Sequence, residues 1–436
     1  MQITILGFVA VIIVLFAALK QKSDILLYAA VFFSGFTGAS VINISTISIQ
    51  PSYLFFILYF IVVIYQTLVS TKVKKVEFPK MLTIFVIYCI ATLITIFFGN
   101  KDQVIVLRQD DKYGEVVFSL SNIIHIGYLL ICYIFYTLLI NKRNRLNQRG
   151  SLYKAYRLGV IAVIIICLYQ IVAMNMNLPF DELFRQGVHG NVQGKRIYGP
   201  CIEASMLSYY LAPSLFLMYL NIKDYKRDII WIALGLVVGV LCYSSTFFIG
   251  VILAVLYFII KGLIYIREKK SMSFFVGAIG LIFIALVSII AAWARIERVV
   301  VELVEKLAAK NESGSIRTEA FQKMSLIGLK YPFGVGFASS RSKDLFSTWM
   351  CNIGIVGMVI FTIMIILYIN RCLKKNHFAE TLPFIMCIIL AMISVPEPYN
   401  LFIWVLMFFG MYGTKGDKIT SRDDIIENEV YSLWWN

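Results

Sequence analysis

The chain has 436 residues, of which 60% are hydrophobic and only 15% are charged, and its mean hydropathy is +0.81. This composition excludes a sizeable soluble domain, because an ordinary water-soluble chain carries considerably more charge. A formal net charge of +15 would suggest nucleic-acid binding in a soluble protein, but here the basic residues are distributed as membrane topology requires. We therefore expect no nucleic-acid partner.

Apolar runs alternate with short charged stretches along the whole chain. Each run approaches the ~20 residues that a helix needs to cross the hydrocarbon core of a bilayer, and most runs contain no charge. Clear examples are residues 3–19, 53–68, 118–140, 274–293 and 353–369. The first run ends in Lys20 and Lys22 without a small-residue cleavage site, so we expect it to be a retained span. The pattern predicts an all-α polytopic membrane bundle of about 12–13 spans over residues 1–413, with a tail at 414–436.

Basic residues collect in alternate connections between the predicted spans. Seven stretches on one predicted side hold 25 of the 40 Lys and Arg residues: residues 20–22, 72–80, 142–157, 223–227, 261–270, 371–375 and the tail. The positive-inside rule places that side and the C-terminus in the cytoplasm, and the N-terminus outside. The assignment depends on residues 229–260, which we interpret as a tight hairpin turning at Ser244 to Thr246. A single tilted helix there would invert the orientation of one half of the chain.

The first substantial outer segment is residues 100–117. Residues 104–107 and 115–118 have the apolar, β-branched character of strands, and they flank a turn that ends in Gly114, so the pattern predicts a β-hairpin. Asp110 and Asp111 have two interpretations, a metal site or turn residues. The turn is favoured, since no third carboxylate is nearby.

The second outer segment, residues 177–199, is rich in glycine and contains the cations Arg185, Lys195 and Arg196. Pro200 suits the first position of the next membrane helix, which would place Glu203 one turn into that helix at its outer mouth. Two interpretations of Glu203 are open. It is either a stabilising first-turn acid or a functional carboxylate, because a carboxylate at the edge of lipid is costly without a partner.

The longest outer segment, residues 294–349, is predicted to contain two amphipathic helices. The first covers residues 296–307, and the second begins near Ser315 and stops at Tyr331-Pro332, with Ala320, Phe321, Met324 and Ile327 on one face. Both are expected to lie with the apolar face on the membrane. Arg317 would lie in the first turn of the second helix, where free N–H groups favour an anion such as phosphate. The alternative is a surface arginine paired with Glu312 or Glu319.

Cysteine and histidine give no sign of a metal site or a disulfide. Six of the cysteines lie in or beside apolar runs, as small buried hydrophobes do: Cys89, Cys132, Cys167, Cys242, Cys351 and Cys387. No pair has metal-ligand spacing with a histidine nearby, so we expect no metal and no disulfide.

Two motifs resemble those of a known family. Arg196-x-x-Gly199-x-x-x-Glu203-x-Ser205 is similar to the Arg, Gly and Glu-Pro-Ser segment of the bacterial O-antigen and capsule repeat-unit polymerases, the Wzy group. Ser313-Gly-Ser315-Ile-Arg317, followed by Tyr331-Pro-Phe-Gly-Val-Gly336 and a span with Asn352-Ile-Gly-Ile-Val-Gly357, resembles the second hallmark of the polymerase and ligase superfamily. There are two departures. Ala204 replaces the usual proline, and the span entered at Trp349 lacks the preceding histidine common in O-antigen ligases.

The resemblance implies a GT-C-like fold and glycosyl transfer at the outer face of the bacterial cytoplasmic membrane. The donor would be a growing glycan on undecaprenyl diphosphate and the acceptor a lipid-linked repeat unit, which gives O-antigen, capsule or exopolysaccharide. A chain-length regulator and a repeat-unit flippase are the implied partners, besides the bilayer itself. No cofactor is required, because the diphosphate is already a good leaving group whose charge arginines can neutralise.

We accordingly expect Arg196 and Arg317 to bind the diphosphate, with Arg317 also stabilising the leaving group, and Glu203 to act on the acceptor hydroxyl as base or orienting group. Further expected diphosphate contacts are Arg185, Lys195 and Arg341. Two rival functions remain open: an O-antigen ligase that transfers glycan to a lipid A core, and a polysaccharide flippase. A transporter would be expected to carry charged or helix-breaking residues near the middle of its spans.

Overall fold

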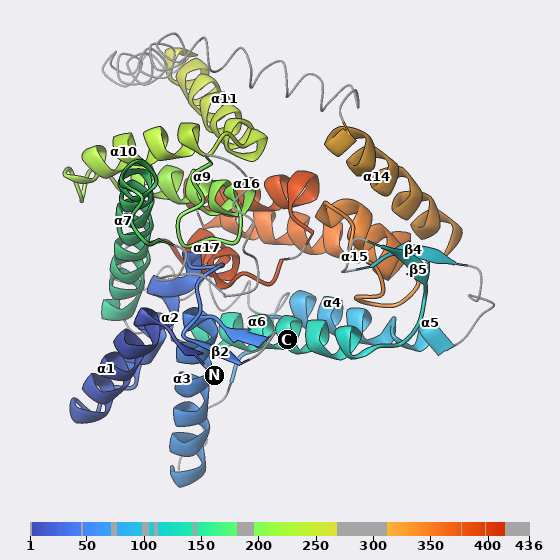
Figure 1. Cartoon of the computed structure of the whole chain (residues 1–436), viewed down its shortest axis with the longest axis horizontal. Coiled ribbons are helices and arrows are strands. Elements are labelled where there is room, and N and C mark those ends of the chain that lie inside the picture. The colour runs from blue at the N-terminus through green and yellow to red at the C-terminus, as the bar shows by residue number, and fades with distance from the viewer. Residues whose placement is uncertain are drawn as a thin grey trace.

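The computed structural model describes residues 2–44, 47–70, 76–97, 104–108, 112–142, 146–180, 196–267, 312–375, 377–396 and 398–414 (Figure 1). Apart from α14 (Glu312–Lys330), twelve apolar helices of ten or more residues dominate these residues. They are α1 (Ile5–Leu19), α2 (Asp24–Phe32, extended by the short helix η1, Phe33–Gly35), α3 (Pro51–Val69), α4 (Lys80–Ala91, continued by α5, Ile94–Phe97), α6 (Leu120–Asn141), α7 (Leu146–Met176), α9 (Ala204–Leu220), α10 (Asp228–Leu241), α11 (Ser245–Arg267), α15 (Leu345–Lys374), α16 (Phe378–Ser394) and α17 (Leu401–Tyr412).

The helices confirm a polytopic α-helical membrane protein. Six of them are long and apolar enough to cross a bilayer by length and composition, and the other six are apolar helices of 10–17 residues. The expected span at residues 274–293, the amphipathic helix at 296–307 and the tail from residue 415 lie outside the described residues.

The hairpin expected within residues 229–260 is confirmed. Helix α10 ends at Leu241 and α11 begins at Ser245, so three residues make the reversal. Tyr243 adopts a positive φ of 48°, which is characteristic of such a tight reversal. The single tilted helix, which would have changed the predicted orientation of one half of the chain, is therefore not observed.

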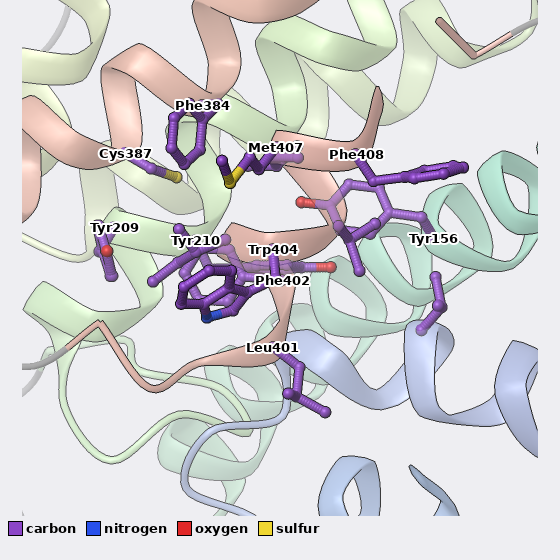
Figure 2. Packing of buried hydrophobic residues seen from close by; sticks show 14 of the residues in the cluster. Tyr156, Tyr209, Tyr210, Phe384, Cys387, Leu401, Phe402, Trp404, Met407 and Phe408 are labelled. Carbon is purple, nitrogen blue, oxygen red and sulfur yellow. The ribbon is translucent and has the colours of Figure 1, made fainter. Parts of the chain in front are cut away.

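Helix α17 forms the centre of the bundle and is coloured red in Figure 1. Every residue from Leu401 to Tyr412 is buried, as expected for a helix that is hydrophobic on all sides. Figure 2 shows how aromatic and thioether side chains interlock around it. The rings of Tyr209 and Tyr210 pack edge-to-face against Phe402, at centroid distances of 5.2 and 5.1 Å.

Short strands mark one end of the bundle, which we call the hairpin end. Strands β1 (Gln2–Ile3), β2 (Ile42–Ile44) and β3 (Ile47–Ile49) form one antiparallel sheet, and β4 (Ile105–Leu107) pairs with β5 (Tyr113–Glu115). The second pair is the hairpin predicted for residues 100–117, although its second strand begins two residues earlier than expected. Asp110 and Asp111 lie outside the described residues.

The opposite end, which we call the basic end, includes several of the predicted basic stretches. Side-chain contacts join the helix ends there: Lys142 Nζ lies 2.8 Å from Asp24 Oδ1, and Asn141 exchanges hydrogen bonds with the backbone of Glu77. A buried ion pair joins Arg157 on α7 to Asp228 at the start of α10. These contacts place parts of several predicted basic connections beside one another.

Helix α15 is broken near its start. Gly354 has φ 66° and ψ −177°, so the backbone leaves the helical conformation there and resumes it immediately. The turn at residues 331–337 lies against the break. Val335 N donates to Cys351 O and Gly336 N to Asn352 O, while Val356 N donates to Pro332 O. These bonds satisfy backbone groups that the break removes from the helix, as a low-dielectric environment requires.

Candidate functional site

The first cationic segment, residues 196–203, is held at the hairpin end by backbone contacts with three helices. Gln170 Oε1, near the end of α7, accepts from Tyr198 N at 3.0 Å and from Gly199 N at 2.8 Å. Ile197 N donates to the last residue of α10, and Pro200 O accepts from Gly38 N just after α2 and η1. Arg196 is half-buried within this frame. Arg185 and Lys195 lie outside the described residues.

The second cationic segment combines α14, the loop before α15 and the β4–β5 hairpin, which lie together in Figure 1. Ala320 and Met324 on α14 are fully buried against Val106 and Leu107 of β4. Arg341 N donates to Leu107 O at 2.8 Å, which fixes the loop that carries the half-buried Arg341 side chain. This part of the predicted apolar face therefore packs on protein instead of on the membrane, whereas Phe321 of the same face is 41% exposed.

A path of contacts connects the two segments. Thr37, near the first segment, accepts from Gln50 at the start of α3, and Tyr53 on α3 donates to Tyr399 O before α17. The Tyr399 ring packs on those of Tyr128 and His125 on α6, at 5.9 and 5.4 Å.

The path continues from α6 into the second segment, because Asn122 Nδ2 donates to Phe337 O at 2.7 Å. The path runs through the start of α3 and the first half of α6, next to the loops that precede α15 and α17. Arg196 and Arg317 are therefore on the same end of the bundle.

Glu203 does not lie where the sequence suggested. Helix α9 begins at Ala204, so Glu203 is the extended residue just before the helix, with φ −149°, and Pro200 belongs to the preceding turn. Its carboxylate does not cap the helix but accepts a hydrogen bond from Ser205 Oγ, and the side chain is exposed. The expectation of a carboxylate one turn into the helix was wrong, because Gly199 adopts φ 54° and turns the chain before the helix can start.

Arg317 also differs in its local setting. Helix α14 begins at Glu312, three residues earlier than expected, so Arg317 lies in the second turn and the anion-binding argument from the first turn no longer applies to it. Glu319, one of its expected partners, pairs with Lys323 instead, at 2.5 Å. The charge of Arg317 acts on Asp344, the residue before α15, where it favours the ionised carboxylate and opposes the rise in pKa that burial causes.

Asp344 is a buried acid that the sequence analysis missed. It precedes α15 as its N-cap: Oδ1 accepts from Ser347 N at 2.8 Å and Oδ2 from Ser347 Oγ at 2.6 Å. Burial raises the pKa of the Asp344 carboxyl above its usual value, whereas the Ser347 bonds and the charge of Arg317 oppose that shift. The signal was present in the sequence, since an Asp directly before an apolar run is a helix-start pattern.

Replacing Asp344 with asparagine is expected to leave the protein at least as stable as the parent at pH 7, because asparagine caps helices equally well and carries no buried charge. The pKa of Asp344 is higher in the folded than in the unfolded state. Its contribution to the free energy of unfolding therefore falls as the pH rises from the unfolded pKa to the folded pKa. The stability advantage of Asp344→Asn should therefore shrink as the pH is lowered toward about 4, the ordinary value for Asp.

Thermal unfolding of purified parent and variant at several pH values measures this difference. Asp344→Ala serves as the control, since it loses the cap as well and should be less stable by about 1 kcal/mol. A difference between Asp344→Asn and parent that stays constant with pH would contradict the interpretation.

Among the residues that the structure describes, no group of three or more His, Cys, Asp or Glu side chains is arranged to hold a metal ion. All eight cysteines are free and buried. Comparison of the chain with protein-family models, with curated proteins and with solved structures finds no match.

Proposed function

We propose that this protein polymerises undecaprenyl-diphosphate-linked oligosaccharide repeat units into O-antigen, capsule or exopolysaccharide. The observation that carries the proposal is the placement of Arg196 and Arg317, each from one of the two Wzy-like motifs, at the same end of the bundle. The two segments come from chain regions more than a hundred residues apart. The tyrosines of the contact path between them have apolar ring faces and polar hydroxyl groups, both of which suit contacts with an oligosaccharide.

The chemistry follows from the charges at this end. The acceptor hydroxyl oxygen attacks the anomeric carbon of the donor, a new C–O bond forms, and the bond from that carbon to undecaprenyl diphosphate breaks. Arg196 and Arg317 bind the diphosphate and neutralise the charge that develops on it, with Arg341 as a further contact and with Arg185 and Lys195 as additional candidates. Glu203, which is exposed and directly precedes α9, receives the acceptor proton. Asp344 acts on Arg317 as a positioning residue.

In this proposal the basic end faces the cytoplasm of a bacterium and the hairpin end faces outward from the cytoplasmic membrane, with a GT-C-like arrangement of the site over the bilayer. The N-terminus is then outside and the tail at 414–436 inside. A repeat-unit flippase would supply the substrate to this face, and a chain-length regulator would act on the product. The described charges on the membrane helices lie near the basic end, which favours an enzyme acting at the hairpin end over a transporter with charged groups near mid-span.

Reconstitution tests the proposal. The purified protein in vesicles, given lipid-linked repeat units, is expected to produce lipid-linked chains of increasing length without added metal or nucleotide. Transfer of glycan only to a lipid A core would identify a ligase, and movement of labelled units across the bilayer without chain growth would identify a flippase. Either outcome would overturn the polymerase assignment.

A further inference from the structure

We propose that a pocket at the basic end binds the phosphodiester headgroup of an anionic phospholipid. The pocket has a volume of about 380 Å³ and is lined by Arg157, the turn from α9 to α10, and the side chains that this turn carries: Lys223, Asp224, Tyr225, Lys226 and Arg227. Its volume is within the range of ~300–1,000 Å³ usual for small-ligand sites. The site lies at the opposite end from the proposed glycosyl transfer and does not depend on it.

A buried ion pair forms one side of the pocket. Arg157 Nε donates to Asp228 Oδ2 at 2.6 Å, and a second guanidinium nitrogen donates to Asp228 Oδ1. Asp228 is completely buried, and the guanidinium carbon lies 4.7 Å from the centre of the Tyr225 ring. The Arg157 guanidinium is thus positioned by the Asp228 carboxylate along its edge and by the Tyr225 ring against its face.

The turn that forms the rim is ordered by its own backbone. Asp224 N donates to Asn221 O at 3.1 Å, and Asp228 N donates to Tyr225 O at 2.9 Å. The turn displays the exposed side chains of Lys223, Lys226 and Arg227 beside one exposed carboxylate, Asp224. Since Arg157 and Asp228 neutralise each other, the rim carries a net charge of +2 and favours an anion.

Exposed apolar residues border the charged rim and identify the ligand as amphiphilic. Ile229 and Ile230 follow the turn directly and are 47% and 61% exposed, and Leu158 next to Arg157 is 50% exposed. These residues begin the membrane-facing surfaces of α10 and α7, so an acyl chain can lie on them while the phosphate occupies the pocket. Basic pockets between membrane helices near the surface bind anionic headgroups in this manner.

The experiment compares lipid retention in two charge-matched variants of the full chain. One carries Lys223→Gln, Lys226→Gln and Arg227→Gln in the pocket. The other carries Lys20→Gln, Lys22→Gln and Lys374→Gln, which removes the same charge from exposed positions at the same end. Native mass spectrometry of protein released from vesicles measures bound phosphatidylglycerol against phosphatidylcholine. Thermal unfolding checks that both variants are folded, and the double variant Lys226→Gln with Arg227→Gln replaces the pocket triple if that triple does not fold.

The pocket variant is expected to retain at least about tenfold less phosphatidylglycerol than the parent, since each of the three basic residues near an anionic headgroup strengthens binding severalfold. The control variant should stay within about twofold of the parent, because its residues lie outside the pocket. Equal losses in both variants would overturn the proposal, since they would indicate general surface attraction. Displacement of the lipid by millimolar inorganic phosphate would overturn the lipid assignment in favour of a free phosphate ligand.

Discussion

Chain growth on lipid-linked repeat units is expected to fall by a factor of ~10² to 10³ when either Arg196 or Arg317 is replaced by alanine, the loss typical of removing one group that stabilises developing charge. Arg317 is exposed and Arg196 half-buried at the hairpin end, so neither change creates a large cavity and both variants should fold. Elongation assays on purified, folded variants measure the effect as the rate of chain extension per enzyme.

The control for Arg317 is Lys323, two turns further along the same helix. Lys323 is exposed, pairs with Glu319 and lies over the Tyr113 ring of β5 at 4.9 Å. Since neither contact involves a proposed substrate-binding residue, Lys323→Ala should keep nearly full activity. Arg196→Lys and Arg317→Lys should be intermediate, because a lysine keeps the charge but not the two-pronged contact with phosphate oxygens. Undiminished elongation in both alanine variants would remove the proposed roles of these arginines.

Hydropathy and the lengths of the apolar runs predicted most of the helical architecture. The α10–α11 reversal and the β4–β5 hairpin are local features, each produced by a few neighbouring residues, and both are found where the sequence placed them to within two or three residues. Helix starts were less accurate. The start of α9, just after Glu203, depends on the turn conformation at Gly199. The start of α14 at Glu312 depends on packing against the distant β4–β5 hairpin.

The site itself depends on contacts between residues far apart in the chain. Asn122 meets Phe337, and Leu107 meets Arg341, across more than two hundred residues, and no local pattern encodes such pairs. The break in α15 is a similar case. Residues 345–369 contain no proline and read as one apolar run, because the break arises only when the turn at residues 331–337 packs against it.

Gly354→Ala is therefore expected to destabilise the fold by about 3 kcal/mol or more. The φ and ψ of Gly354, 66° and −177°, lie in a region that is essentially restricted to glycine. An added Cβ would also stand 2.1 Å from Pro332 O and 2.4 Å from Gly334 N, both backbone atoms that hold the turn in place. Thermal unfolding of the purified variant in detergent measures the loss.

Gly127→Ala on α6 is the matched control, because an added Cβ there meets no atom within 4 Å. Alanine is the better helix former, so this variant should be as stable as the parent or more stable, by up to about 1 kcal/mol. Gly354→Ala should also reduce elongation more than its stability alone explains, because the turn it displaces leads directly into Arg341 and Asp344. A Gly354→Ala variant with parental stability would mean that the break in α15 does not require glycine, and the geometry of the second cationic segment would need another explanation.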